Sequence, residues 1–230
     1  MKQKIIKFIL MLLCITALVF SCVKITYYIK DENNISSLQR GSMTAELVSL
    51  TEKHYSDVTL LVKHTLISYD VMQGEDNEYY LTHTPDGEYN KAGWIFFDYR
   101  VNKDSRNKII YGHNRVTGSM FGSLSNLTMP SYYDKYGTDT IYLEEKDKIS
   151  VYRIFAVYTV NKDFNYLICD FEDNEKFMEY LSKVRKLNKI EALESVVVDE
   201  ESEILTLSTC SGVNDRLVVQ AVKVEEREGK

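Results

Sequence analysis

The pattern of apolar and polar positions divides the chain into three unequal parts. Residues 5–23 form an almost uninterrupted apolar run, "IIKFILMLLCITALVFSCV". Residues 31 to about 53 are polar, lack proline and carry only scattered apolar residues, which favours a helical stalk. From about residue 58, short β-branched and aromatic runs alternate with turn-forming clusters, the pattern of a mostly β domain.

The β-rich part contains eight runs that we interpret as strands. They cover residues 58–63, 66–72, 93–98, 107–111, 139–143, 149–160, 203–209 and 216–224. The segment at 170–190 interrupts them, because its apolar residues recur at helical spacing from Phe177 to Leu187. We therefore predict one long helix immediately before the last two strands.

The N-terminal apolar run has about the length that a helix needs to cross a bilayer, roughly 20 residues. Lysines lie before it at positions 2 and 4 and near its start at position 7, which favours a cytoplasmic N-terminus and an external body. The alternatives are a cleaved signal peptide and a lipoprotein signal that ends at Cys22, although the bulky Phe20 does not suit a processing site. The predicted division is a cytoplasmic tail at 1–4, a transmembrane anchor at 5–23, a helical stalk at 24–55, the main domain at 56–226 and a tail at 227–230.

Composition and charge narrow the classes of function. Hydrophobic residues make up 44% of the chain and charged residues 27%, the balance of a folded protein rather than of a disordered or polytopic membrane protein. Residues 1–30 carry five lysines and no acidic residue. Subtracting these five positive charges from the net charge of −6 leaves −11 on residues 31–230. An acidic body without a basic stripe excludes nucleic acid as a partner.

The cysteines favour a free thiol over a disulfide or a metal site. Cys14 and Cys22 lie in the apolar run, which leaves Cys169 and Cys210 in the main domain. Two cysteines are too few for a disulfide framework, and no cysteine or histidine pair has zinc-ligand spacing. We interpret Cys169 as a small buried hydrophobic residue and Cys210 as a free thiol, and we expect neither a metal nor another cofactor.

The segment "ILTLSTCSGVNDRLVVQAVKV" at 204–224 carries the candidate chemistry. Cys210 ends one predicted strand and Arg216 opens the next, the pattern of a hairpin with the two side chains at facing positions. A thiol becomes a useful nucleophile when a cation stabilises its thiolate or a base lies nearby. Arginine keeps its proton, so it can stabilise negative charge but cannot act as a base. His113, which follows the strand "KIIYG", is the candidate for proton transfer.

Two motifs, taken together, resemble those of a known family. "TLSTC" at 206–210, followed by Arg216, and "YGHN" at 111–114 resemble the sortases, membrane-anchored cysteine transpeptidases of Gram-positive cell surfaces. The resemblance extends from about residue 58 to residue 224 and is greatest for class B, through "FFDYR" at 96–100, "QGEDNEYYL" at 73–81 and the predicted long helix. It implies a closed eight-stranded β-barrel, with residues 56–226 as the catalytic domain.

The resemblance also implies a reaction and its partners. Cys210 would attack the threonine carbonyl of a C-terminal sorting motif of the Asn-Pro-x-Thr type in a secreted protein. Arg216 would stabilise the oxyanion, and His113 would move the protons. A peptidoglycan amine would then accept the acyl group, while the N-terminal anchor holds the enzyme in the cell membrane with its catalytic domain outside. The implied substrate-binding residues are Asn77, Leu81, Tyr166, Leu167, Ser208 and Thr209.

The sequence departs from the family pattern at several positions. Asp70 stands where proline is frequent, and "DVTLLV" at 57–62 stands where a Gly-Trp pair is frequent. Only five residues separate Cys210 from Arg216, and Gly212 stands where class B members often carry an acidic residue. Two alternatives remain open. They are a pilin-polymerising sortase, which would want a lid loop over the cysteine, and an inactive surface binding module on the same barrel.

Overall fold

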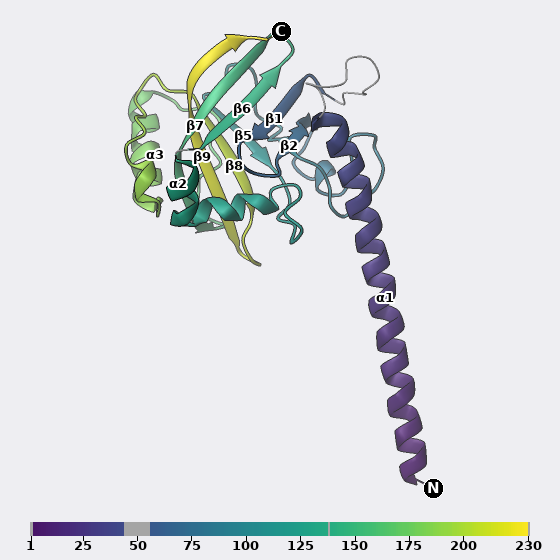
Figure 1. Cartoon of the computed structure of the whole chain (residues 1–230). Coiled ribbons are helices and arrows are strands. Elements are labelled where there is room, and N and C mark those ends of the chain that lie inside the picture. The colour runs from purple at the N-terminus through teal and green to yellow at the C-terminus, as the bar shows by residue number, and fades with distance from the viewer. Residues whose placement is uncertain (1, 44–55, 138, 230) are drawn as a thin grey trace.

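A computed structural model describes residues 2–43, 56–137 and 139–229. Figure 1 shows helix α1, Lys2–Met43, packed beside a β-rich body at one end and projecting away from it toward the N-terminus. Its stretch Leu10–Lys30 is long and apolar enough to cross a membrane. That stretch overlaps the predicted anchor at 5–23. The predicted stalk is helical as far as Met43, and its remainder, 44–55, lies outside the described residues.

The body is one nearly closed sheet. Its strands are β1 (Val58–Val62), β2 (Ser68–Asp70), β3 (Met72–Gln73), β4 (Phe96–Phe97), β5 (Asn107–Tyr111), β6 (Thr140–Glu145), β7 (Lys148–Asn161), β8 (Ile204–Cys210) and β9 (Asp215–Glu228). Their order is β2-β1-β6-β7-β9-β8-β5-β4-β3. The two edge strands, β2 and β3, are joined by Val71 alone. The chain therefore passes directly from one edge of the sheet to the other, which closes most of the barrel.

The prediction of a mostly β barrel is confirmed, and each predicted strand overlaps an observed one. The count is nine rather than eight because the predicted strand 66–72 is divided at Val71. There the Val71 amide donates to the Val58 carbonyl (2.7 Å), whereas the Met72 amide donates to the Ile95 carbonyl (3.0 Å). One continuous run of sequence thus pairs with two different neighbours.

The predicted long helix is present as α3, Asn174–Leu187. The Asp173 carboxylate caps it by accepting a hydrogen bond from the Lys176 amide at 2.8 Å, the usual role of aspartate at this position. Its apolar face packs on the outside of the sheet with Phe155 and Val218. A second helix, α2 (Pro130–Tyr136), and the 3₁₀ segments η1 (Tyr79–Leu81), η2 (Gly122–Thr128) and η3 (Glu191–Leu193) are too short to show a helical period.

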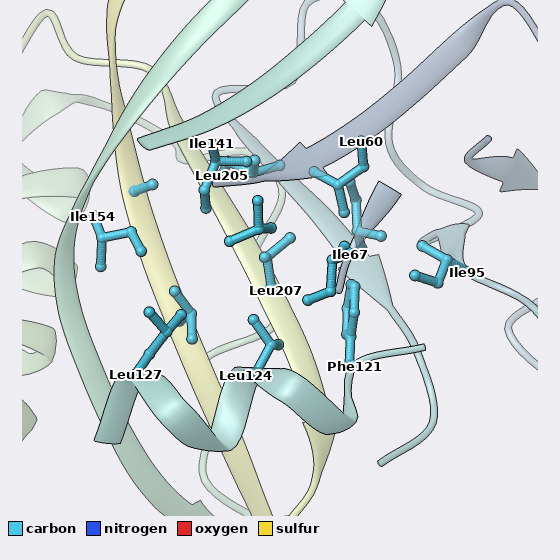
Figure 2. Packing of buried hydrophobic residues seen from close by; sticks show 14 of the residues in the cluster. Leu60, Ile67, Ile95, Phe121, Leu124, Leu127, Ile141, Ile154, Leu205 and Leu207 are labelled. Carbon is cyan, nitrogen blue, oxygen red and sulfur yellow. The ribbon is translucent and has the colours of Figure 1, made fainter. Parts of the chain in front are cut away.

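The main core fills the barrel interior. Figure 2 shows Phe121, which precedes the η2 segment, and Leu124 and Leu127 of that segment projecting toward Leu207 and Ile154 of the strands. All five side chains have no exposed surface. Burial of each such side chain contributes about 1.5–3 kcal/mol. The strands that carry the candidate site are therefore held from inside by a well-packed core.

Candidate active site

A groove of about 430 Å³ lies where β5 and β8 end and β9 begins. Every site residue predicted from the sequence lines it, although the role of each stays a prediction. The predicted residues are Cys210, His113, Arg216, Asn77, Leu81, Tyr166, Leu167, Ser208 and Thr209. Phe96, Tyr111, Gly112 and Lys162 complete the lining.

The β8–β9 hairpin brings the thiol and the guanidinium together. Antiparallel pairing sets Cys210 directly opposite Arg216, as the sequence predicts. Cys210 is an exposed free thiol, whereas Cys169 is buried, which raises the pKa of the Cys169 thiol to about 11. Arg216 donates to the Asp215 carbonyl at 3.0 Å, and no carboxylate among the described residues pairs with it. Its charge is therefore available to an anion that forms in the groove.

The parallel pairing of β5 with β8 brings the histidine to the same place. The register sets Tyr111 beside Ser208, and two residues further along each chain stand His113 and Cys210. The Asn114 side chain then joins the two strand ends, since its Nδ2 donates to the Cys210 carbonyl at 2.8 Å. The imidazole and the thiol thus emerge from neighbouring strand ends, a hundred residues apart in sequence.

A backbone carbonyl holds the imidazole. His113 Nε2 lies 2.7 Å from the Leu81 carbonyl oxygen. Because a carbonyl only accepts hydrogen bonds, Nε2 carries the proton in this contact, and Nδ1 is left to exchange a proton. Among the described residues, the side chains of Asp98, Tyr99, Asn114 and Asp215 make no hydrogen bond to the ring. The sequence could not have revealed this contact, because every residue carries a backbone carbonyl oxygen and nothing in the sequence singles out that of Leu81.

The backbone at Gly112, immediately before His113, lies close against the Phe121 ring. A Cβ on Gly112 would lie 2.8 Å from Cγ of the Phe121 ring. Phe121 is fully buried in the barrel core, so the ring has little freedom to move aside. The position of His113 is therefore set from one side by core packing and from the other by the Leu81 carbonyl.

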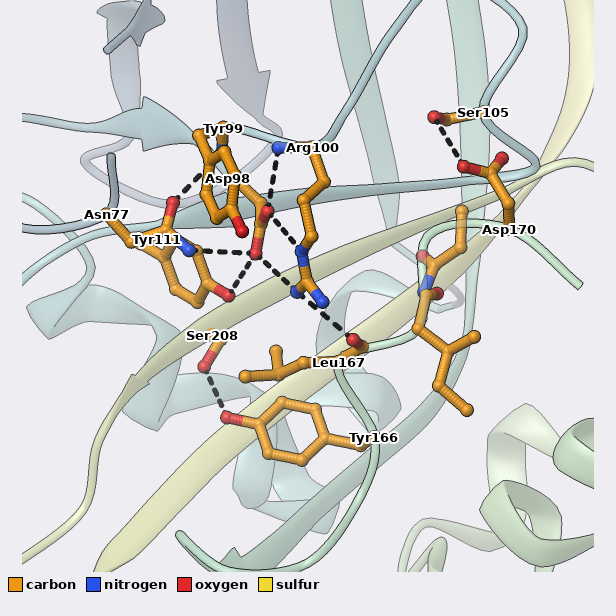
Figure 3. A network of polar contacts seen from close by, with 12 residues as sticks. Asn77, Asp98, Tyr99, Arg100, Ser105, Tyr111, Tyr166, Leu167, Asp170 and Ser208 are labelled. Carbon is orange, nitrogen blue, oxygen red and sulfur yellow. Dashed lines mark hydrogen bonds and ion pairs between the residues drawn. The ribbon is translucent and has the colours of Figure 1, made fainter. Parts of the chain in front are cut away.

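A buried carboxylate organises the wall beside the groove (Figure 3). Asp98 has no exposed surface and accepts hydrogen bonds from Arg100 Nε and Nη2 at 2.8 Å each, from Tyr111 Oη at 2.7 Å and from Asn77 Nδ2 at 3.0 Å. Burial alone would raise the pKa of Asp98. The hydrogen bonds from Arg100 and Tyr111 outweigh it and lower the pKa to about 2. Asp98 is thus ionised and holds three neighbours in place.

Several of the predicted substrate-binding side chains are already engaged. Besides donating to Asp98, Asn77 accepts the Tyr99 amide hydrogen at 2.9 Å, so both ends of its amide are occupied. Ser208 Oγ lies 2.8 Å from Tyr166 Oη (Figure 3). The Thr209 hydroxyl is buried and has no partner among the described residues. Leu81 and Leu167 contribute apolar surface to the groove.

Lys162 is a groove residue that sequence reasoning missed. It follows β7, and its amide donates to the Asn214 carbonyl at 2.7 Å. The β7–β9 register sets Val160 beside Arg216, which carries the end of β7 to the groove. Only this long-range pairing indicates the position of Lys162, and a single sequence does not contain it. With Arg216, it gives the groove a second cationic side chain.

Known proteins resemble the chain in sequence and in fold. The family model described as "Sortase domain" matches residues 60–224. Sortase B of Listeria monocytogenes is 36% identical over 170 residues, which cover 70% of this chain and 66% of the Listeria protein, just under two thirds of its length. A structure of Bacillus anthracis sortase B in complex with AAEK1 has 26% identity and a TM-score of 0.73, covering 87% of this chain and 99% of that one. A Staphylococcus aureus sortase B–substrate complex has 25% identity and a TM-score of 0.68, covering 84% of each chain.

Proposed function

The chain belongs to the sortase family, and from that membership we propose that it cleaves a C-terminal sorting motif of a secreted protein and transfers the product to a peptidoglycan amine. Its likeness to class B sortases supports a transpeptidase of that class. The observation that carries the proposal is the meeting of Cys210, His113 and Arg216 in one groove, on strand ends that are paired in register.

The first half of the proposed reaction acylates the cysteine. His113 Nδ1 takes the proton of the Cys210 thiol, the resulting thiolate attacks the threonine carbonyl carbon, and the carbonyl electron pair moves onto the oxygen. Arg216, without a carboxylate partner among the described residues, stabilises that oxyanion. As the intermediate collapses, the carbon–nitrogen bond breaks and His113 Nδ1 gives a proton to the departing amine. The products are a thioester on Cys210 and a free C-terminal fragment.

The second half transfers the acyl group. An amine enters the groove and His113 Nδ1 takes its proton, which makes the amine nucleophilic. The amine nitrogen attacks the thioester carbonyl, the carbon–sulfur bond breaks, and the Cys210 thiolate is restored. One amide bond is broken and one is formed, so the reaction needs no external energy source. The N-terminal helix is the proposed anchor, with the catalytic domain outside the cell.

The groove supports a peptide substrate bound mainly through apolar contacts. We assign the motif to the Asn-Pro-x-Thr type of the class B resemblance. Leu81 and Leu167 supply apolar surface for it, whereas the Asn77 amide is engaged by Asp98 and the Tyr99 amide. Asn77 would therefore act by holding the groove wall in shape.

The test is incubation of the full chain, in detergent micelles, with a library of quenched sorting peptides, followed by intact mass measurement. We expect a peptide-sized adduct on the wild type and none on Cys210→Ala. Cys169→Ala is the matched control, because it removes the buried thiol and should keep the adduct. Undiminished cleavage by Cys210→Ala would remove the nucleophile assignment. No adduct and no cleavage with any peptide would favour the inactive binding module.

A further inference from the structure

The loop that follows His113 is attached to α1 beside the outer end of its apolar stretch. The Glu32 carboxylate accepts hydrogen bonds from Arg115 Nη2 and from Thr117 Oγ1, each at 2.8 Å. The Arg115 guanidinium also lies over the Tyr28 ring, 4.6 Å from its centroid. Tyr28 is inside the stretch Leu10–Lys30, and Glu32 is two residues beyond it. The loop is therefore held level with the end of that stretch.

This attachment is partly buried and charged. The side chains of Arg115 and Glu32 are only 12% and 18% exposed. Burial would raise the pKa of Glu32, but hydrogen bonds from Ser119, Arg115 and Thr117 outweigh it and lower the pKa. Behind the loop, a Cβ on Gly122 would clash with the Arg115 carbonyl oxygen. The loop is thus fixed between α1 and the barrel.

Two apolar tips lie on this side of the groove. Val116, between Arg115 and Thr117, is fully exposed, and Val213, in the β8–β9 turn, is 93% exposed. The loop and the turn adjoin, because Asn114 binds the Cys210 carbonyl. Figure 1 shows the β8–β9 turn at the lower end of the body, on the side toward which α1 runs to its N-terminus.

We propose that Val116 and Val213 rest in the outer headgroup layer of the membrane that α1 spans, so that the groove opens at the lipid surface. The inference rests on the proposed anchor and takes its outer end at Lys30, where the stretch Leu10–Lys30 ends, rather than at residue 23 as expected from the sequence. At 1.5 Å per residue, Glu32 lies about 3 Å beyond Lys30 along the helix. Each headgroup layer is about 5–8 Å thick. A loop bonded to Glu32 and stacked on Tyr28 therefore lies within that layer.

The residues around the end of the stretch fit this placement. Tyr27, Tyr28 and Lys30 are exposed tyrosines and a lysine of the kind that is enriched where a helix leaves the bilayer. Val116 and Val213 would otherwise expose apolar surface to water beside the groove. With the groove at the lipid surface, substrates that are attached to the membrane can reach Cys210 without leaving the membrane.

The test uses the full chain with Val116→Trp in phosphatidylcholine–phosphatidylglycerol vesicles, with and without bromine on the upper acyl chains, which quenches nearby indole. The wild type fluoresces from the buried Trp94, and the variant adds the signal of Trp at position 116. We expect the brominated lipid to quench most of this added fluorescence. The matched control is Val197→Trp, because Val197 is also exposed but lies in the segment that leads to the other end of β8. Equal quenching at positions 116 and 197 would overturn the proposal.

A second control separates this inference from the proposals on which it rests. Phe20→Trp, within the apolar stretch, should be quenched in the same vesicles, and its failure to be quenched would overturn the anchor and the inference together. The peptide adduct is measured on the same samples. An active protein with an unquenched tryptophan at position 116 would overturn the inference alone. An inactive protein with that tryptophan quenched would overturn only the proposed function.

Discussion

At the scale of single residues, the imidazole of His113 is held by a neutral backbone oxygen, and the buried carboxylate of Asp98 beside the groove binds other groups. The Leu81 carbonyl fixes the ring without placing a full negative charge beside it. A carboxylate in that place would stabilise the imidazolium and oppose its loss of a proton. Asp98 instead binds Arg100, Tyr111 and Asn77. The proposed reaction, which needs His113 to give a proton and later take one, is compatible with this arrangement.

The Asp98 carboxylate should make stability depend on pH in the acid range. Its pKa is lowered to about 2, against about 3.9 for an unfolded aspartate. Its contribution is therefore full above about pH 4 and is lost as pH falls through about 2. The difference corresponds to about 2–3 kcal/mol. We expect Asp98→Asn to lower the unfolding free energy by about that amount at pH 7 and to approach the wild type near pH 2, measured by urea denaturation.

The control for this prediction is Asp163→Asn, since Asp163 is an exposed turn residue. It should leave the unfolding free energy unchanged across the same range. A deficit in Asp98→Asn that stayed constant from pH 7 to pH 2 would show that the charge of Asp98 does not stabilise the fold.

The sequence revealed the groups whose chemistry depends on residue type. Cys210, His113 and Arg216 were predicted because a thiol, an imidazole and a guanidinium stand at strand ends, and the family resemblance added the residues of the groove wall. It missed Lys162, because nothing near that lysine in the sequence distinguishes it from a surface lysine. The substrate-binding role of Asn77 stays a prediction: Asn77 lines the groove, and the bond from its amide to Asp98 is set by tertiary packing that the sequence does not show.

At the scale of elements, β8 supports the site because it has different neighbours on its two sides. It pairs in parallel with β5, which ends two residues before His113, and antiparallel with β9, which begins one residue before Arg216. Alternating β-branched and aromatic runs predicted these strands within a few residues. Their pairing could not be predicted from the pattern, because β5 and β8 are separated by α2, β6, β7 and α3. The division of the run 66–72 at Val71 likewise follows from pairing partners that lie far away in sequence.

The junction between β5 and η2 should be intolerant of a single added methyl group. Gly112→Ala would bring a Cβ to 2.8 Å from the buried Phe121 ring. We expect a loss of about 1–3 kcal/mol in unfolding free energy, together with slower adduct formation because His113 moves. The double variant Gly112→Ala, Phe121→Leu should recover part of both losses, since leucine leaves more room. Strict additivity of the two substitutions would mean that the ring does not fix the backbone.

At the scale of the whole molecule, α1 and the barrel behave as one unit because Glu32 joins them. The Arg115 side chain is largely buried and its Nε has no partner among the described residues, so Glu32 is important for keeping the guanidinium satisfied. Length and apolar composition predicted the helix, but not this contact. Neither Glu32 nor Arg115 belongs to a recognisable motif, and their attraction depends on how the helix lies against the loop.

Removal of the Glu32 carboxylate should therefore destabilise the body as well as loosen the helix. We expect Glu32→Ala to lower the unfolding free energy of the full chain by about 1–3 kcal/mol, because it leaves a largely buried cation unpaired. Chemical denaturation in detergent micelles measures the loss. Asn33→Ala is the matched control, since Asn33 is exposed and adjacent. Equal stability of the two variants would show that the ion pair contributes nothing.

The closure of the sheet at Val71 also restricts how a peptide can be bound. The free edges are β2, three residues long, and β3, two residues long. An extended chain that adds to a sheet by β-augmentation needs a longer row of unpaired amide and carbonyl groups than these edges present. The barrel is for the same reason a poor template for edge-to-edge aggregation. A sorting peptide would therefore have to be bound by loops and side chains. The shape of the groove, rather than pairing with a neighbouring strand, would then set the conformation of the peptide backbone.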